Sequence, residues 1–269
     1  MQISILGPLQ VRTQDGPVAV SGARLRTLLT LLALHANQVV TNRRLIDGIW
    51  GGDPPSGALH ALRALVSRLR RVLPEPVIVS RTTGYELSLP PEAVDIRRFE
   101  RLAALGRGQL ASDPGAAART LREALDLWRG NPLSEIEDTE LAHGARTALT
   151  DLRTGAVEDR VEAELRLGAG PRLTAELAGL VELHPMRERL RGQLMQALYS
   201  AGRQAEALEV FEEARRMLGS GLGVDPSPLL KATHMAILQG RPVADVTGEY
   251  GEGAPPPLPA PRTEASPST

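Results

Sequence analysis

The sequence predicts a mainly α-helical protein that begins with a small mixed α/β region. Strand-like runs separated by Gly and Pro occupy the first twenty residues, and two more lie between residues 77 and 89. From residue 95 to about residue 239, apolar residues recur three and four positions apart without strand alternation, which is typical of helices. A length of 269 residues favours two domains.

Three strands and two helices are expected first. The strands are residues 3–6, 9–12 and 18–20; a Gly-Pro pair separates the first two, and an Asp-Gly-Pro turn precedes the third. A helix over residues 23–36 carries a leucine-rich face. Thr41 is the predicted N-cap of a shorter helix over residues 42–50.

A third, basic helix follows two prolines, with Ser56 as its predicted N-cap. Its apolar residues recur at spacings of three and four and form one stripe, which consists of Leu59, Leu62, Val66, Leu69 and Leu73. At about 100° per residue, the opposite face carries polar, small and basic residues. This pattern predicts a helix with one buried face and one basic face.

A hairpin of two short strands, residues 77–81 and 85–89, closes this region. Three strands, three helices and two strands in this order predict a winged helix-turn-helix over residues 1–91. In such a domain one helix enters the major groove of double-stranded DNA, and the wing contacts a neighbouring phosphate or the minor groove.

The candidate DNA-binding residues lie on the basic helix and in the wing. Ala64 and Ser67 are small enough to let the helix approach base edges, and arginine beside them can fork onto guanine or clamp a phosphate. Taken alone, the helix would fit a solvated surface helix equally well, and the flanking elements favour DNA. The candidates are His60, Arg63, Ala64, Ser67, Arg68, Arg70 and Arg71 on the helix, with Arg81, Thr82 and Thr83 in the wing.

The charge is divided between the two parts of the chain. The net charge is only −1, but residues 1–91 hold ten arginines and five acidic residues, which gives +5 and leaves −6 for residues 92–269. A basic N-terminal region joined to an acidic remainder fits DNA contact at one end and protein contact at the other.

Residues 92–240 are expected to form an all-α domain. Asp113-Pro114 and Asp225-Pro226 are predicted helix starts, and the glycine-rich runs 168–171 and 219–221 are predicted breaks. The expected helices are residues 96–110, 114–129, 141–168, 172–182, 186–201, 204–218 and 227–239.

The segment 186–226 resembles a tetratricopeptide repeat. Leu190, Leu194 and Tyr199 face one way on its first helix. Small and large apolar residues line the second, namely Ala205, Ala207, Leu208, Phe211 and Ala214. One repeat cannot bury its own core, so neighbouring helices must stack on it, and such a stack is more often a protein-binding surface than a catalytic one.

Several motifs carry a resemblance to a known family. "ILGPLQV", "LIDGIWGGDPPSGA", "LRALVSRLRRVL" and "RTTGYELSL" resemble the OmpR-type winged-helix domain of the Streptomyces antibiotic regulatory proteins, the SARPs. "VDIRRFERLAALGR", "ALDLWRGNPLSE" and the run from His184 to Leu230 resemble their bacterial transcriptional activator domain (BTAD). Relatives often have a glycine-richer turn before the wing tyrosine, whereas this chain has Thr82-Thr83-Gly84.

This resemblance implies a transcriptional activator of secondary-metabolite (antibiotic) biosynthesis genes. It implies binding to direct repeats in promoters near the −35 element, as a homodimer or as paired protomers, and recruitment of RNA polymerase including its sigma factor. Two alternatives remain open: a repressor or ligand-responsive regulator of the same architecture, and a TPR-type protein-binding adaptor. The charge division argues against the adaptor.

The residues indicate little chemistry. There is no Cys, the five His are scattered without metal-ligand spacing, and no nucleophile elbow or P-loop is present, so we expect no enzyme activity, cofactor or metal. Trp50 and Trp128 are expected to fill core, and Tyr85 to support the wing. An acidic run is expected to serve the following helix N-terminus, with a contact to polymerase as the alternative; it consists of Glu135, Glu137, Asp138 and Glu140.

The C-terminal residues 241–269 are rich in Pro, Gly, Ser and Thr and predict a disordered tail. No receiver domain, ATPase module or other built-in sensor is expected. No export signal and no apolar run of about 20 residues is visible, so we expect a cytoplasmic protein without a membrane partner.

Overall fold

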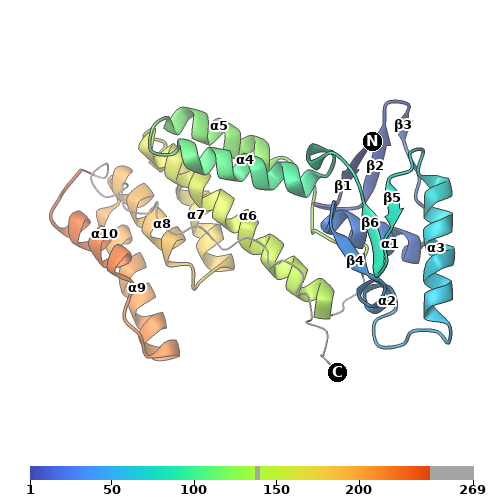
Figure 1. Cartoon of the computed structure of the whole chain (residues 1–269). Coiled ribbons are helices and arrows are strands. Elements are labelled where there is room, and N and C mark those ends of the chain that lie inside the picture. Colours follow the sequence, from blue (N-terminus) through green and yellow to red (C-terminus); the bar gives the residue numbers. More distant parts are fainter. Residues whose placement is uncertain (137–139, 243–269) are drawn as a thin grey trace, which may run out of the picture. The chain divides into compact units, whose positions relative to one another are not determined.

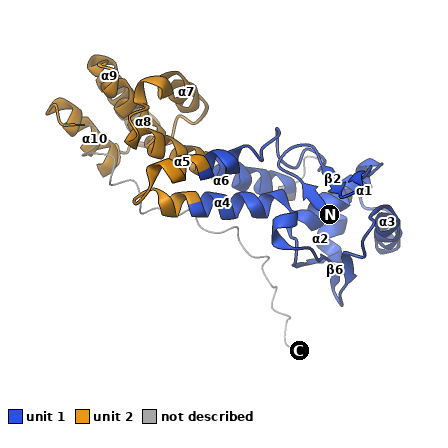
Figure 2. Cartoon of the chain, turned by 90° about the horizontal axis from the view of Figure 1, so that it is seen from above, with its two compact units in different colours: residues 1–105, 120–153 blue, residues 106–119, 154–269 orange. Residues whose placement is uncertain are grey.

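The computed structural model describes residues 1–136 and 140–242. In this part of the chain, two three-stranded sheets and three helices are followed by a series of further helices (Figure 1). The chain divides into two compact units (Figure 2). Unit 1 is Met1–Leu105 with Thr120–Arg153, and unit 2 is Gly106–Arg119 with the described residues from Thr154 onward.

The first sheet has the antiparallel order β1-β2-β3. Its strands are β1 (Gln2–Ser4), β2 (Gln10–Thr13) and β3 (Gly16–Pro17). The predicted third strand at residues 18–20 is wrong. Pairing resumes directly after the two-residue turn, because Gly16 and Pro17 lie opposite Thr13 and Arg12.

The second sheet contains a strand that the sequence did not reveal. β4 (Val39–Thr41) pairs with β6 (Gly84–Leu87), which also pairs with β5 (Ile78–Ser80) in the order β4-β6-β5. The two strands approach closely at Gly84, where a Cβ atom would lie 1.9 Å from the Val40 carbonyl oxygen. A side chain at residue 84 is therefore incompatible with this pairing.

Three helices complete the winged helix-turn-helix. They are α1 (Ala23–Leu34), α2 (Asn42–Trp50) and α3 (Ala58–Val72). The N-cap prediction for Thr41 is confirmed, because its Oγ1 accepts a hydrogen bond from the Arg44 N–H at 3.3 Å. The prediction for Ser56 is wrong: Gly57 is the N-cap, with a left-handed φ of 82° that glycine adopts readily.

A loop that precedes α6 (Glu140–Arg166) is anchored to the N-terminal region within unit 1. Glu135 binds the Arg26 guanidinium at 2.5 and 2.7 Å and accepts a hydrogen bond from the Leu9 N–H at 3.2 Å. The prediction that the Glu135 charge stabilises the N-terminus of the following helix is therefore wrong. Glu137 and Asp138 lie outside the described residues, as does the side chain of Glu140.

A buried carboxylate connects the same regions. Asp95 begins α4 (Asp95–Gln109), which follows a short 3-10 helix, η1 (Pro91–Ala93). The Asp95 carboxylate accepts hydrogen bonds from the backbone N–H groups of Ile5 and Leu6 at 2.8–3.0 Å. Burial raises the pKa of Asp95, and these hydrogen bonds and the nearby Arg129 oppose that increase.

Five helices make up the rest of the described chain: α5 (Pro114–Leu125), α7 (Gly170–Leu183), α8 (Glu188–Ser200), α9 (Gln204–Leu222) and α10 (Pro228–Leu238). The start predicted at Asp113-Pro114 is confirmed, since the Asp113 carboxylate accepts the Ala116 N–H at 2.8 Å. The second predicted start is wrong, because the Ser227 hydroxyl caps α10 by accepting the Leu230 N–H.

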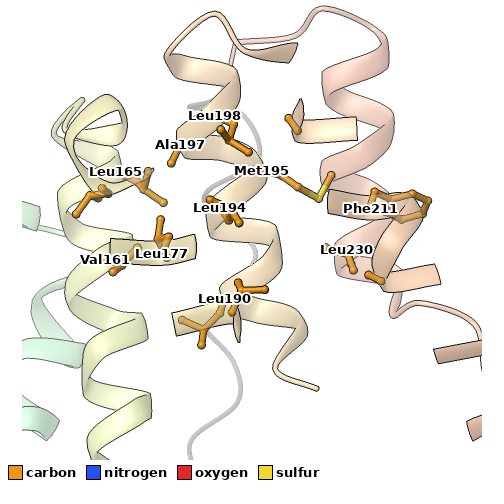
Figure 3. Close-up of a cluster of buried hydrophobic side chains, with 14 of the residues drawn as sticks. Val161, Leu165, Leu177, Leu190, Leu194, Met195, Ala197, Leu198, Phe211 and Leu230 are labelled. Carbon is orange, nitrogen blue, oxygen red and sulfur yellow. The ribbon is translucent and has the colours of Figure 1, made fainter. Parts of the chain in front are cut away.

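The predicted break at 219–221 is also wrong. Helix α9 continues to Leu222 and ends at Gly223, which adopts a left-handed φ of 69°. Ala205 is exposed rather than lining the repeat. Buried side chains of α8 form the centre of the unit 2 core, as Figure 3 shows for Leu190, Leu194 and Leu198.

Unit 2 also holds a buried ion pair network that periodicity did not indicate. Asp159, on the part of α6 that belongs to unit 2, is 2% exposed. It accepts hydrogen bonds from Arg107 and Arg189, each at 2.7 Å. Because a buried charge needs this kind of pairing, Asp159 fixes these two arginines around α6.

None of the helices in the described part of the chain is long and apolar enough to cross a membrane.

We predict that the stability of unit 1 depends on His35. Burial lowers the pKa of His35 to about 4 from its ordinary value of 6.5, and the charges of Arg44 and Arg97 add to this effect. Between these values the unfolded chain binds the proton and the folded chain does not. Stability from this group is therefore complete above pH 6.5, and about 3 kcal/mol is lost as the pH falls to 4.

Urea unfolding at several pH values measures this loss, with His35→Gln as the control. The wild type should lose about 3 kcal/mol more than the variant over this window. Parallel pH profiles for the two proteins would contradict the prediction.

We also predict that Gly84→Ala destabilises unit 1 by roughly 3 kcal/mol, because the new Cβ would overlap the Val40 carbonyl and force β4 and β6 apart. Gly52→Ala is a matched control, since nothing lies within 4 Å of a Cβ at that position. Equal urea midpoints for the two variants would show that the strands shift at little cost.

Candidate nucleic-acid interface

Helix α3 has one buried face and one exposed face. Leu62, Val66 and Leu69 are 0–2% exposed and fix the helix on the domain. Leu59, predicted to belong to the same stripe, is 39% exposed, because the first turn of α3 extends beyond the core. The opposite face is open to solvent and carries all the helix candidates, namely His60, Arg63, Ala64, Ser67, Arg68, Arg70 and Arg71.

Three arginines on this face have no acidic partner within the part of the chain that the structure describes. Among the described residues, no carboxylate forms a salt bridge with Arg63, Arg68 or Arg71, and α3 itself contains no acidic residue. Elsewhere in the chain, exposed arginines commonly pair with a nearby glutamate, as Arg101 does with Glu92. The exposed face of α3 therefore presents positive charge that the domain does not neutralise.

Arg70 differs from these three residues. Its guanidinium donates hydrogen bonds to the Ile78 carbonyl at 3.1 and 2.8 Å and to the Ser80 hydroxyl at 2.9 Å. Both acceptors belong to β5, the first strand of the wing. The structure thus brings α3 and the wing together through Arg70.

The wing turn is short and well anchored. Arg81 and Gly84 exchange backbone hydrogen bonds across Thr82 and Thr83, and all three candidate wing residues (Arg81, Thr82 and Thr83) are exposed. The Arg81 Nε donates to the Glu86 carboxylate at 2.8 Å. The Thr83 carbonyl accepts the Asn42 N–H at 2.9 Å, so the turn is held against the start of α2.

The N-terminus of α2 was not among the predicted sites. Arg43 and Arg44 occupy its first turn, which has no acidic residue, and the Arg43 side chain is 85% exposed. Cations are unfavourable at a helix N-terminus, whereas backbone N–H groups there bind phosphate well. Two arginines in the first turn after the N-cap Thr41 are a signal that could have identified this turn as a candidate phosphate contact.

The aromatic residues of unit 1 differ in how deeply they are buried. Trp128 is buried and packs edge-on against Phe99, with ring centroids 5.3 Å apart, which confirms its predicted core role. The core prediction for Trp50 is wrong: its side chain is half-buried at the end of α2, with the Arg24 guanidinium 5.9 Å from the centre of its ring. Tyr85 is buried in β6, opposite Val40 and Ser80, where it supports the wing as predicted.

Among the described residues, no group of three His, Asp or Glu side chains is placed to hold a metal ion.

Family comparisons identify both parts of the chain. Residues 19–87 match the family described as "Transcriptional regulatory protein, C terminal", and residues 94–238 match "Bacterial transcriptional activator domain". The regulatory protein DnrI of Streptomyces peucetius is 37% identical, over 92% of this chain and 96% of its own length. The transcriptional regulator RedD of Streptomyces coelicolor is 36% identical, over 91% of this chain and 73% of its own length.

Other relatives are longer. The regulatory protein AfsR of Streptomyces coelicolor is 39% identical over 94% of this chain, which spans only 26% of AfsR. The solved structure of Mycobacterium tuberculosis EmbR, in complex with a low affinity phosphopeptide, aligns with a TM-score of 0.86 and 32% identity. That alignment covers 93% of this chain and 68% of the EmbR chain. With both family matches in the expected order and such relatives along nearly its whole length, the chain belongs to the SARP family of DNA-binding transcriptional activators.

Proposed function

We propose that the exposed face of α3 enters the major groove of promoter DNA and reads its sequence. The observation that carries this proposal is the set of three unpaired arginines, Arg63, Arg68 and Arg71, around the small residues Ala64 and Ser67. Small residues permit a close approach to base edges, and the unpaired guanidinium groups are available for guanine or phosphate.

The wing residues contact the neighbouring backbone in this proposal. Thr82 and Thr83 present hydroxyl groups at an exposed turn, and Arg81 can exchange its Glu86 partner for a phosphate. His60 lies at the N-terminal end of the same face of α3. Arg70 keeps its hydrogen bonds to β5 and sets the position of the wing relative to α3.

The operator and the partners follow from the family resemblance. We propose that two protomers bind direct repeats near the −35 element of promoters for secondary-metabolite (antibiotic) genes in the cytoplasm. They would then recruit RNA polymerase and its sigma factor. In this proposal residues 1–91 bind DNA and residues 92–240 contact protein. The predicted tail, residues 241–269, lies outside the described residues from residue 243 onward. The acidic charge of residues 92–269 supports a protein partner for the helical part.

A footprint on the promoter regions that flank the gene tests the DNA-binding proposal, with purified protein at physiological salt. Protection of two direct repeats near −35 is the expected result. Weak protection without sequence preference that disappears with modest salt would contradict it.

In vitro transcription from the protected promoter then separates activation from repression. Increased transcript with purified polymerase is expected, whereas decreased transcript would favour the repressor alternative. A dependence on an added small molecule would favour a ligand-responsive regulator.

Arg71→Ala should weaken operator binding by about 1–3 kcal/mol, because a charged contact to DNA is lost. Kd measured over a salt series distinguishes its role. Loss of discrimination at one base pair indicates base readout, and a salt slope reduced by about 1 indicates a phosphate contact. Arg215→Ala is the matched control, since Arg215 is an exposed arginine on α9 in unit 2. Unchanged binding by Arg71→Ala would contradict the proposal.

Arg70→Gln should behave differently from Arg71→Ala. Its loss removes the hydrogen bonds to Ile78 and Ser80, so the free energy of unfolding should fall by about 1–3 kcal/mol. Operator affinity should fall while the salt slope stays at the wild-type value, because no phosphate contact is lost. A normal stability together with a reduced slope would show instead that Arg70 binds phosphate.

A further inference from the structure

Unit 2 contains a groove of about 680 Å³ that the DNA-binding function does not use. Helix α8 forms its floor, and α7 and α9 form its two walls. The floor is apolar, because Leu194 and Leu198 line it from the core shown in Figure 3. Stacked helix pairs of this kind commonly bind other proteins along such surfaces.

The α7 wall is built from small side chains. Ala175 and Ala178 line the groove and are both exposed, and Gly179 beside them is exposed as well. Without longer side chains on this wall, another backbone can approach the apolar floor. The α7 wall therefore leaves room for a segment of another chain beside the floor residues of α8.

The α9 wall is acidic. Glu206, Glu209 and Glu213 line the groove at spacings of three and four residues, so they follow one side of the helix. Glu206 is neutralised inside the chain by Arg203, whose Nη2 lies 2.5 Å from the carboxylate. Within the described chain Glu209 has no basic partner. Glu213 forms an ion pair with the buried Arg191 at 3.6 Å, but its own side chain is 64% exposed and stays accessible from the groove.

Besides Glu206, three charged side chains of α9 line the groove. Glu209 and Glu213 are one turn apart, and Arg216 lies at the far end of the same wall. Glu212, which does not line the groove, is paired with Arg215 at 2.7 Å.

We propose that this groove binds an amphipathic helix of a partner protein that carries basic residues. An apolar side chain of that helix would lie on Leu194 and Leu198, and two Arg or Lys residues one turn apart would face Glu209 and Glu213. Arginine forms forked hydrogen bonds with carboxylates, and an amphipathic helix in an apolar groove is a recurrent mode of recognition.

Selection from a displayed library of random helical peptides on the full chain tests this proposal. Enriched peptides should share an apolar residue flanked by two basic residues at a spacing of three or four. Their affinity, measured by fluorescence anisotropy, should fall about tenfold or more in the double variant Glu209→Arg and Glu213→Arg.

Two further variants keep the test specific. Ala178→Trp fills the groove from the opposite wall at an exposed position and should weaken the same peptides. Glu212→Arg reverses a charge on the same helix outside the groove and should leave their affinity unchanged. Operator binding should be the same in all these variants, so failure here is distinguishable from failure of the DNA-binding proposal.

Three outcomes would overturn the proposal: no enriched peptide, peptides without basic residues, or equal binding to the groove variants and the wild type. Sedimentation of the free protein could give a fourth outcome that overturns the proposal. If the groove variants dissociate an existing dimer, a second copy of the chain occupies the groove instead.

Discussion

One buried carboxylate, that of Asp95, connects segments of unit 1 that are distant in sequence. Asp95 accepts the backbone N–H groups of Ile5 and Leu6 at 2.8–3.0 Å, and Arg129 lies 3.6 Å away. A buried charge is tolerated only when it is paired and hydrogen-bonded, so these partners have to remain in place together. The backbone carbonyl groups just after β1 accept two more hydrogen bonds. The Leu6 carbonyl accepts the Arg129 N–H, and the Ile5 carbonyl accepts the Leu133 N–H.

The exposed face of α3, which we propose binds DNA, depends on this arrangement through helix packing. Glu135 from the same loop binds Arg26 on α1, and α1 packs against both α2 and α3. The residues that support α3 therefore extend beyond the winged helix-turn-helix into segments after residue 91, in agreement with a compact unit that includes Thr120–Arg153. On the outer side, Arg70 connects α3 to the wing, which leaves Arg63, Arg68 and Arg71 available for DNA.

Helical periodicity predicted most helices and the exposed basic face of α3, because both are local properties of the sequence. β4 was missed because three residues are too few to show alternation. The roles of Glu135 and Arg70 could not be predicted, since their partners lie in other elements and for Glu135 more than 100 residues away. The N-cap of α3 is Gly57 rather than the predicted Ser56, because the N-cap has a left-handed φ that glycine readily adopts.

Hydrogen exchange of backbone amides in the wild type and in Asp95→Ala tests the role of this carboxylate most directly. We expect the amides of Ile5, Leu6, Arg129 and Leu133 to lose protection together in the variant, because one buried group holds both segments. Amides of α8 in unit 2 serve as the internal reference and should keep their protection. Faster exchange at Ile5 and Leu6 alone, with Arg129 and Leu133 unchanged, would contradict the account.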